Sequence, residues 1–361
     1  MTSWKTYKLG DILNFRRGHD LPKTQMVDGK IPVAGSNGII GYHNVSTPIE
    51  PCITIGRSGN VGTPYIYDRC WAHNTVLYID DFKGNDPLYL YYLLKTIPLA
   101  SYGGGSAVPT LNRNHIHPIE IKHTPSLEEQ RRIAGILGAI DDKIECNRRI
   151  NDNLEQQAQA LFDNIFFGDK DVERNPLSDY ANINPTRALR QGVVARYIEM
   201  ANLPTRGSFP YDWSYKSYGG GCKFANGDTI MARITPCLEN GKTAYIDFLE
   251  EQEIAFGSTE YIVISAKSGY CPALFYFLAR NKEFVDYAVG HMNGSSGRQR
   301  VSGVDIANFS MPHITLEESN KFAEIAMPIM DVIRNNSLGN RHLATLRDTL
   351  LPKLMNGEIK L

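Results

Sequence analysis

The architecture of this chain is decided by Ser126-Leu127-Glu128-Glu129-Gln130-Arg131-Arg132-Ile133-Ala134, which opens a segment that ends at Gly168. A second segment of the same pattern opens with Thr315-Leu316-Glu317-Glu318 and ends at Gly357. The two segments superpose at an offset of 189 positions, the difference between 315 and 126. A repeat on this scale indicates that the molecule is built twice on one plan.

Both segments carry the start and stop signals of one long helix. Ser126 and Thr315 are each followed three residues later by a glutamate, which is the pattern of a capping box. Gly168 and Gly357 stand where a left-handed residue commonly ends a helix. We therefore expect each segment to form a single long helix.

Between these ends, one apolar stripe follows each helix in alternating steps of four and three residues. This is the a/d spacing of a two-stranded coiled coil. Both stripes are interrupted by two asparagines at the same places, and a buried polar residue in such a seam fixes register and partner. The alternative, an ordinary amphipathic surface helix, does not account for the duplicated asparagines. The seam positions are Ile133, Leu137, Ile140, Ile144, Asn147, Asn151, Leu154, Ala158, Leu161 and Ile165 in the first copy, and Phe322, Ala326, Ile329, Ile333, Asn336, Asn340, Leu343, Arg347, Leu350 and Leu354 in the second.

The composition is that of a soluble globular protein with more than one domain. The chain has 361 residues and a formal net charge of −1. It has no run of about 20 apolar residues, as a membrane helix needs, and no hydrophobic signal-peptide core follows Met1, so a cytoplasmic protein is expected. The six cysteines are scattered without a C-x-x-C pair, which argues against a zinc knuckle. The near-zero net charge limits any nucleic-acid surface to a local patch of a few arginines.

Each helical segment follows a β-rich segment that contains a small helix. Residues 1–125 contain short β-branched runs broken by glycine turns, and a helix from Leu88 to Lys95. Residues 168–314 repeat this plan loosely, with a helix from Pro272 to Phe284. The expected fold class is α+β with an internal pseudo-two-fold repeat. The predicted domains are a globule at 1–125, a helical arm at 126–167, a second globule at 168–314 and a second arm at 315–361.

Enzyme signatures are weak in this sequence. The stretch from Gly56 to Gly62 is glycine-rich but lacks the Gly-Lys-Ser/Thr ending of a phosphate loop. Asp86-Pro87-Leu88-Tyr89 differs by one residue from the Asp-Pro-Pro-Tyr of adenine methyltransferases, and no fingerprint for the methyl donor accompanies it. The sequence contains neither G-x-S-x-G nor H-E-x-x-H. We therefore expect no catalytic residue and no metal site.

The remaining candidates are side chains that could contact DNA. Arg57 and Arg233 follow equivalent strands, where a guanidinium could bind guanine O6 and N7. Asn112 with Arg113 follows one glycine loop and Arg298-Gln299-Arg300 follows its counterpart, where the backbone could approach phosphates. Asn60, in the turn after Arg57, belongs to the same candidate set. The alternative for each of these residues is a solvated loop side chain.

These features resemble the specificity subunit of Type I restriction-modification systems. The resemblance rests on two unlike β-rich globules, each followed by a long helix that begins S/T-L-E-E, and on the ending Leu350-Leu351-Pro352-Lys353-Leu354-Met355-Asn356-Gly357-Glu358-Ile359. It implies that each globule is a target recognition domain that reads one half of a split double-stranded DNA sequence. It also implies that the two helices pair antiparallel, set the spacing of the half-sites and dock two methyltransferase subunits, which restriction subunits then join.

The resemblance further implies that the chain itself is no enzyme and holds no cofactor. S-adenosylmethionine, ATP and magnesium would belong to the partner subunits. Ser319 in place of Gln130, and Arg347 in place of Ala158, would make the two docking surfaces unequal. The alternative function is a coiled-coil scaffold or ligand-binding module whose globules bind no DNA. The seam residues that would hold the spacing are Ile140, Ile144, Leu154, Leu161, Ile329, Ile333, Leu343 and Leu350.

Overall fold

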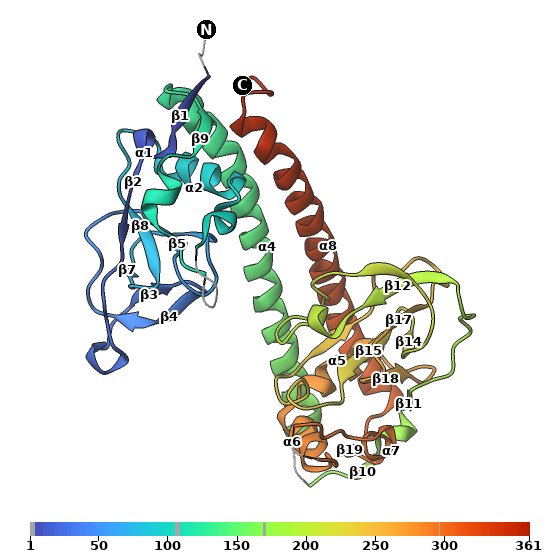
Figure 1. Ribbon diagram of the computed structural model, residues 1–361. Coiled ribbons are helices and arrows are strands. Elements are labelled where there is room, and N and C mark those ends of the chain that lie inside the picture. Colours follow the sequence, from blue (N-terminus) through green and yellow to red (C-terminus); the bar gives the residue numbers. More distant parts are fainter. Residues whose placement is uncertain (1–3, 105–108, 169–170, 296) are drawn as a thin grey trace. The chain divides into compact units, whose positions relative to one another are not determined.

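The computed structural model describes residues 4–104, 109–168, 171–295 and 297–361. The chain divides into two compact units (Figure 1). Unit 1 comprises residues 1–144 and 342–361, and unit 2 comprises residues 145–341. Each unit therefore contains one β-rich globule and part of both long helices. The expected α+β class, with two globules and two long helices, is confirmed.

Unit 1 has two small sheets and a two-stranded pair. One sheet has the antiparallel order β2-β8-β5-β6, and β5 lies inside it with all five residues buried. The second sheet has the order β4-β3-β7, in which β3 and β7 are parallel. The predicted helix at 88–95 is confirmed as α2, and Asp86 caps it by accepting the Tyr89 N–H at 2.9 Å. The elements are β1 (Lys5–Lys8), α1 (Leu9–Ile12), β2 (Asn14–Arg17), η1 (Lys23–Gln25), β3 (Ile31–Gly35), β4 (Gly38–His43), β5 (Cys52–Gly56), β6 (Pro64–Tyr67), β7 (Trp71–Ala72), β8 (Val76–Asp81), α2 (Pro87–Thr96), η2 (Leu99–Tyr102), α3 (Arg113–Ile116) and β9 (Glu120–His123).

Unit 2 repeats this topology in different residues. Its first sheet has the order β11-β18-β15-β16, and its second has the order β13-β12-β17-β14, with β12 and β17 parallel as β3 and β7 are. The pair β10-β19 corresponds to β1-β9. The elements are β10 (Arg174–Pro176), η3 (Leu177–Asp179), β11 (Ala181–Ile183), β12 (Val194–Ile198), η4 (Met200–Asn202), β13 (Ser214–Ser217), β14 (Lys223–Phe224), β15 (Asp228–Ala232), β16 (Thr243–Tyr245), β17 (Ala255–Gly257), β18 (Tyr261–Ala266), α5 (Pro272–Arg280), α6 (Lys282–Gly290), α7 (Gly303–Ala307) and β19 (Ser310–Pro312).

The predicted helix from Pro272 to Phe284 is wrong in its extent, because two helices occupy this region. α5 ends at Arg280 and α6 begins at Lys282. The residue between them, Asn281, has an extended backbone, and its side-chain oxygen accepts the N–H groups of Glu283 and Phe284 at 3.0 and 3.2 Å. Asparagine favours such caps over a helix interior, and here it ends one helix and starts the next.

The two long helices, α4 (Leu127–Phe167) and α8 (Leu316–Met355), pack against each other in both units. In unit 2 the side chain of Asn147 donates to Asn340 at 2.8 Å, and Asn336 donates to Asn151 at 2.8 Å. Residue numbers rise along one helix as they fall along the other, so the pairing is antiparallel. Among the described residues, no helix is long and apolar enough to cross a membrane.

The predicted seam holds along most of α4 and shifts near its end. Ile133, Leu137, Ile144, Asn147 and Ala158 are buried. The assignment of Ile165 to the seam is wrong, because its side chain is 44% exposed and Phe162 and Phe166 are buried instead. An α-helix has 3.6 residues per turn, so a stripe drawn at 3.5 drifts off the buried face over several heptads.

The helix starts differ from the prediction in one copy. In α8 the capping box is complete, since Thr315 accepts the Glu318 N–H at 3.2 Å and Glu318 accepts the Thr315 N–H at 2.9 Å. In α4, Ser126 accepts the Glu129 N–H at 3.4 Å, but the Glu129 carboxylate bonds instead to the hydroxyl of Thr124 and the indole of Trp4. The capping box of α4 therefore lacks its second hydrogen bond, from the Ser126 N–H to Glu129, because tertiary partners bind the glutamate instead.

Gln130 and Ser319 occupy equivalent buried positions, and each accepts a backbone hydrogen bond from the residue that precedes a short helix. Gln130 accepts the N–H of Asp86, the residue before α2, at 2.8 Å. Ser319 accepts the N–H of Cys271, the residue before α5, also at 2.8 Å. Both side chains are fully buried, so the prediction that this difference makes two docking surfaces unequal is wrong.

Candidate nucleic-acid interface

The backbone of unit 1 fixes Arg57 at the end of the central strand β5. Its N–H donates to the Thr75 carbonyl at 2.8 Å, and its own carbonyl accepts the Leu111 N–H at 2.8 Å. The preceding residue must be glycine, because a Cβ on Gly56 would lie 1.8 Å from the Asn60 carbonyl oxygen. Arg57 is thus held between two segments by bonds that leave its guanidinium unused.

Four arginines line one groove in unit 1, which we call the arginine groove. Its volume is about 390 Å³. Arg16 and Arg17 are the last two residues of β2, and sequence reasoning missed them. The signal that could have found them is a pair of adjacent arginines at a strand end. The lining residues are Arg16, Arg17, Arg57, Leu77, Thr110, Leu111, Asn112 and Arg113.

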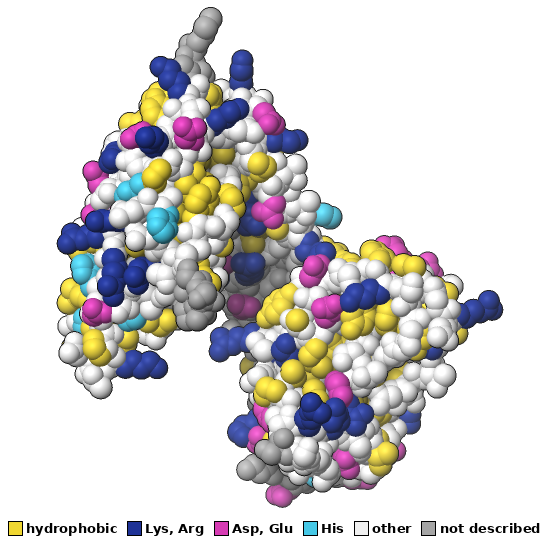
Figure 2. Space-filling model, viewed as in Figure 1, with side chains coloured by type: hydrophobic (Ala, Val, Ile, Leu, Met, Phe, Trp, Pro, Cys, Tyr) yellow, Lys and Arg dark blue, Asp and Glu magenta, His cyan; other side chains and the backbone are white. Residues whose placement is uncertain are grey.

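Little negative charge opposes these arginines. Among the described residues, Arg16, Arg57 and Arg113 form no ion pair, and Arg17 approaches Asp20 only at 4.0 Å with both side chains exposed. The Arg113 guanidinium donates to the Phe15 carbonyl at 3.2 Å, which orients it without neutralising it. Figure 2 shows Lys and Arg side chains, with histidines beside them, on the face of this unit over β2 and β7. The arginine groove is therefore a concentrated source of positive potential.

His117 lies beside the arginine groove and is held neutral. Burial, together with the nearby charges of Arg113 and Lys83, lowers its pKa. Its Nε2 atom accepts the N–H of Phe15 at 3.2 Å, which needs the unprotonated ring nitrogen. His117 therefore adds no positive charge to the arginines of this region at neutral pH.

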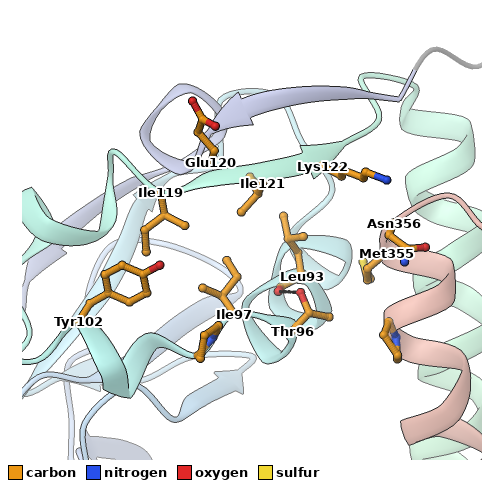
Figure 3. Close-up of a pocket in the computed structure, with 12 residues that line it drawn as sticks. Leu93, Thr96, Ile97, Tyr102, Ile119, Glu120, Ile121, Lys122, Met355 and Asn356 are labelled. Carbon is orange, nitrogen blue, oxygen red and sulfur yellow. Dashed lines mark hydrogen bonds between the residues drawn. The ribbon is translucent and has the colours of Figure 1, made fainter.

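A second cavity in unit 1 has a different chemistry (Figure 3). It encloses about 370 Å³ between the end of α2, strand β9 and the last turn of α8. Leu93, Ile97, Ile121 and Met355 line it, while the Glu120 carboxylate points away from it. No set of charged side chains converges on this cavity, so it offers no site for a phosphate or a polar base edge.

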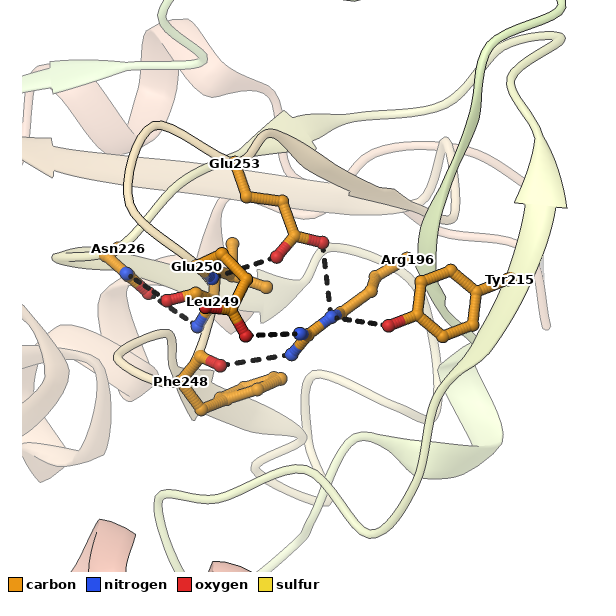
Figure 4. Close-up of polar contacts among 7 residues, drawn as sticks. All are labelled: Arg196, Tyr215, Asn226, Phe248, Leu249, Glu250 and Glu253. Atoms are coloured by element: carbon orange, nitrogen blue, oxygen red, sulfur yellow. Dashed lines mark hydrogen bonds and ion pairs between the residues drawn. The ribbon is translucent and has the colours of Figure 1, made fainter.

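Arg196 in unit 2 shows how a structural arginine is bound in this protein (Figure 4). Its guanidinium donates to the Phe248 carbonyl at 3.0 Å and pairs with Glu253 at 3.1 Å and Glu250 at 3.4 Å. It also donates to the Tyr215 hydroxyl at 3.2 Å. All three nitrogen atoms of this guanidinium are bound by the protein and the side chain is only 11% exposed, so a ligand has little access to it. The arginines of the groove in unit 1 lack such carboxylate partners.

Arg233 in unit 2 occupies the same structural position as Arg57. Its N–H donates to the Glu260 carbonyl at 3.0 Å, and its carbonyl accepts the Val301 N–H at 3.0 Å. It follows the fully buried strand β15 as Arg57 follows β5. Its Nε atom is buried and has no hydrogen-bond partner. Sequence comparison placed these two arginines at equivalent strand ends, and the matching backbone bonds agree with that placement.

Arg300 lies next to Arg233 and is bound by an acidic residue that sequence reasoning missed. Its Nε and Nη2 atoms donate to the Glu260 carboxylate at 2.7 to 3.0 Å, and its Nη1 donates to the Arg298 carbonyl at 3.1 Å. The hydrogen bonds from Arg300 hold the pKa of Glu260 below its ordinary value. Arg300 takes the place of Thr110, because both residues form the isolated β-bridges that close this loop.

The other candidate residues have local structural roles or are exposed. Asn60 accepts a hydrogen bond from the Thr63 hydroxyl at 3.4 Å and does not line the groove. Asn112 lines the groove, but its side-chain oxygen is occupied as the cap of α3. Arg298 is exposed, and Gln299 is half-buried with its carbonyl bound to the Thr235 N–H. The predicted glycine loop before Asn112 spans residues 102–106, of which 105 and 106 lie outside the described residues.

Comparison with known proteins gives a consistent result. Residues 1–156 match the family model described as Type I restriction modification DNA specificity domain. Over 314 residues the chain is 26% identical to the Type I restriction enzyme MjaIX specificity subunit of Methanocaldococcus jannaschii, covering 75% of this chain and 69% of that one. It is 28% identical over 151 residues to the EcoAI specificity subunit of Escherichia coli, a match that spans 39% of this chain and 25% of that protein. The crystal structure of a Type I restriction-modification S subunit from M. genitalium shares the fold, with a TM-score of 0.67 at 14% identity over 98% of this chain and 96% of that one.

Proposed function

We propose that the chain is a specificity subunit of a Type I restriction-modification system and that it reads a bipartite DNA sequence, one half with each of its two units. The match of residues 1–156 to the specificity-domain model and the 26% identity to a specificity subunit over 314 residues support this proposal. On this proposal the chain is a DNA-recognition subunit and not itself an enzyme. We also propose which surfaces of the chain contact the DNA.

One observation carries the proposal: Arg57 and Arg233 stand at equivalent strand ends, and neither guanidinium is bound by a carboxylate. Among the described residues neither arginine forms an ion pair; the Nε atom of Arg233 is buried, so its Nη atoms would make the contact. A guanidinium fork of this kind matches guanine O6 and N7 in the major groove. The arginines that flank Arg57 in the arginine groove would bind phosphates and hold the register.

The proposed partners follow from the same assignment. The paired helices α4 and α8 would set the distance between the half-sites and dock two methyltransferase subunits, which restriction subunits then join. The chain would hold no metal or cofactor of its own, and S-adenosylmethionine, ATP and magnesium would be bound by those subunits. The seam supports this role because its asparagines pair across the two helices and fix their register.

The test uses the full chain, alone and in its assembled complex, with a library of duplexes of random sequence. Selection and sequencing of bound duplexes should yield two short motifs separated by a fixed gap. Arg57→Ala should relax one motif and Arg233→Ala the other, each with a loss of discrimination of about 1–3 kcal/mol. Arg206→Ala, which removes an exposed charge in unit 2 outside the candidate interface, is the control and should relax neither.

Two outcomes would contradict the proposal. If the wild-type complex selects no sequence, the chain does not specify DNA. If Arg57→Ala and Arg233→Ala weaken binding to all duplexes equally, these arginines contact phosphates and do not read bases.

A further inference from the structure

The two units place different charges at equivalent positions. In unit 1, Arg16 pairs with Tyr78 across the sheet, and in unit 2 the corresponding residue is Asn184, whose N–H bonds to Val263. The groove in unit 1 thus contains four arginines with little opposing charge. Elsewhere on the surface, acidic side chains lie beside basic ones in both units (Figure 2), so this difference in charge is local to the groove.

A second substitution of the same kind lies at the short helices. Arg113 follows the cap of α3, whereas Gly303 follows the cap of α7, Ser302.

The positively charged residues of unit 2 that lie nearest to Asn184 are bound by other groups of the protein. The Nη2 atom of Arg187 donates to both oxygens of the buried Asp228 carboxylate at 2.5 Å and to the Ser265 hydroxyl at 3.3 Å. The Lys223 ammonium donates to a backbone carbonyl at 3.0 Å. The pair of Arg233 and Arg300, opposed by Glu260, therefore carries one net positive charge.

The bonds to Glu260 leave a defined part of Arg300 free. A guanidinium has five N–H donors, and the contacts with Glu260 and the Arg298 carbonyl use three of them. The side chain of Arg300 is 39% exposed and that of Glu260 is 26% exposed, so a ligand can reach both. Two donors on a fixed plane are what a base edge with two acceptors requires.

We propose that Glu260 is a positioning residue that holds Arg300 as a fixed fork for base recognition, whereas the arginine groove of unit 1 supplies most of the attraction for the phosphate backbone. This inference rests on the proposed function. A neutralised, ordered arginine attracts phosphate weakly, but it loses little side-chain entropy when a base binds. Arginines without a carboxylate partner attract phosphate more strongly, since each one that neutralises a phosphate releases condensed counterions. Unit 1 would then contribute most of the attraction for phosphates and unit 2 a fixed contact with a base, in addition to any difference between the sequences that the two units read.

Salt dependence separates the two contributions. The full chain, alone or in its assembled complex, is titrated against one fixed duplex by fluorescence anisotropy between about 50 and 200 mM salt. Arg16→Ala and Arg17→Ala should each reduce the slope of log K against log salt by about one and leave the selected motifs unchanged. Glu260→Gln should increase that slope by about one, because it frees the charge of Arg300.

Base selection tests the positioning role of Glu260. In the random-duplex selection, Glu260→Gln should lower discrimination about tenfold at one or two positions of a single half-site. Glu260→Asp keeps the charge and should recover part of it. The matched control is Glu253→Gln, which makes the same chemical change in an ion pair with the structural Arg196 of the same unit. It should alter neither the motif nor the slope.

The outcomes distinguish this inference from the proposed function. If the wild-type chain selects two motifs but Glu260→Gln selects the same ones, or changes them no more than Glu253→Gln does, the positioning role is wrong. If Arg16→Ala and Arg17→Ala leave the salt slope unchanged, the assignment of phosphate attraction to unit 1 is wrong. If the wild-type chain selects no sequence at all, the proposed function fails first.

Discussion

The polar seam between α4 and α8 allows a quantitative test within unit 2. The side chain of Asn151 accepts the Asn336 amide at 2.8 Å and donates to the Ser337 hydroxyl at 3.2 Å. Asn151→Leu leaves the amide of Asn336 without a partner, which costs about 1–3 kcal/mol, and the half-buried site favours the lower end. Asn336→Leu leaves one acceptor unpaired and should cost about 1 kcal/mol.

The double variant should be more stable than the sum of the single changes predicts. Replacing both hydrogen-bonding partners by apolar side chains removes the unpaired groups and extends the apolar seam, so the double variant should lie near the wild type. The expected coupling energy is about 1–2 kcal/mol. Asn153→Leu, on the exposed face of the same helix, is the matched control and should change stability by less than about 0.5 kcal/mol.

Urea unfolding of the full chain measures this coupling. Trp213 is the single tryptophan of unit 2, while Trp4 and Trp71 belong to unit 1. A background with Trp4→Phe and Trp71→Phe therefore makes fluorescence report on unit 2, and the cost of this background cancels between variants. If the costs of the two leucine substitutions add within about 0.5 kcal/mol, the asparagines do not interact across the seam and the reasoning is refuted.

Two further predictions concern buried polar groups. Burial, partly offset by Arg334, raises the pKa of Asp247 to about 7, so between about pH 4 and pH 7 the folded state binds more protons than the unfolded state and its stability should fall as pH rises. Urea titrations at each pH should show that Asp247→Asn flattens this fall, which is at most about 4 kcal/mol. If the dependence of stability on pH is unchanged in the variant, the carboxyl is not buried. Gln130→Ala should cost about 3 kcal/mol of unfolding free energy, because it leaves the Asp86 N–H and the Thr124 carbonyl unpaired. The control, Gln156→Ala on the exposed face of α4, should cost less than about 0.5 kcal/mol, and equal losses would contradict the role of Gln130.

The long helices could be predicted because their signals are local in the sequence. Capping residues and the a/d spacing identify a helix without knowledge of what it packs against. The errors arose where tertiary contacts decide the outcome. Glu129 is drawn from its capping box by Trp4, and the seam moves from Ile165 to the neighbouring phenylalanines as the helix turns. Gln130 reads as a surface residue of a helix start, yet it is fully buried against the segment before α2.

The candidate interface could be predicted only in part, for the same reason. Arg57 and Arg233 were found because each follows a strand in a repeated pattern of turns. Arg16 and Arg17 reach Arg57 only through the pairing of β2 with β8 and of β8 with β5, which no local pattern shows. Glu260 was missed because it is an isolated acidic residue before a strand, and its role depends on Arg300, which lies 40 positions away.

The repeat places different side chains on one backbone plan. Where the two copies must form the same packing, different residues make equivalent bonds, as Gln130 and Ser319 do. The backbone bonds of Arg57 and Arg233 match, while the side chains around these two arginines differ in charge. The shared backbone thus fixes the position of the arginine, and the neighbouring side chains decide whether it has a carboxylate partner. On the proposed function, this difference alone would make the two units unequal in DNA recognition without any change in fold.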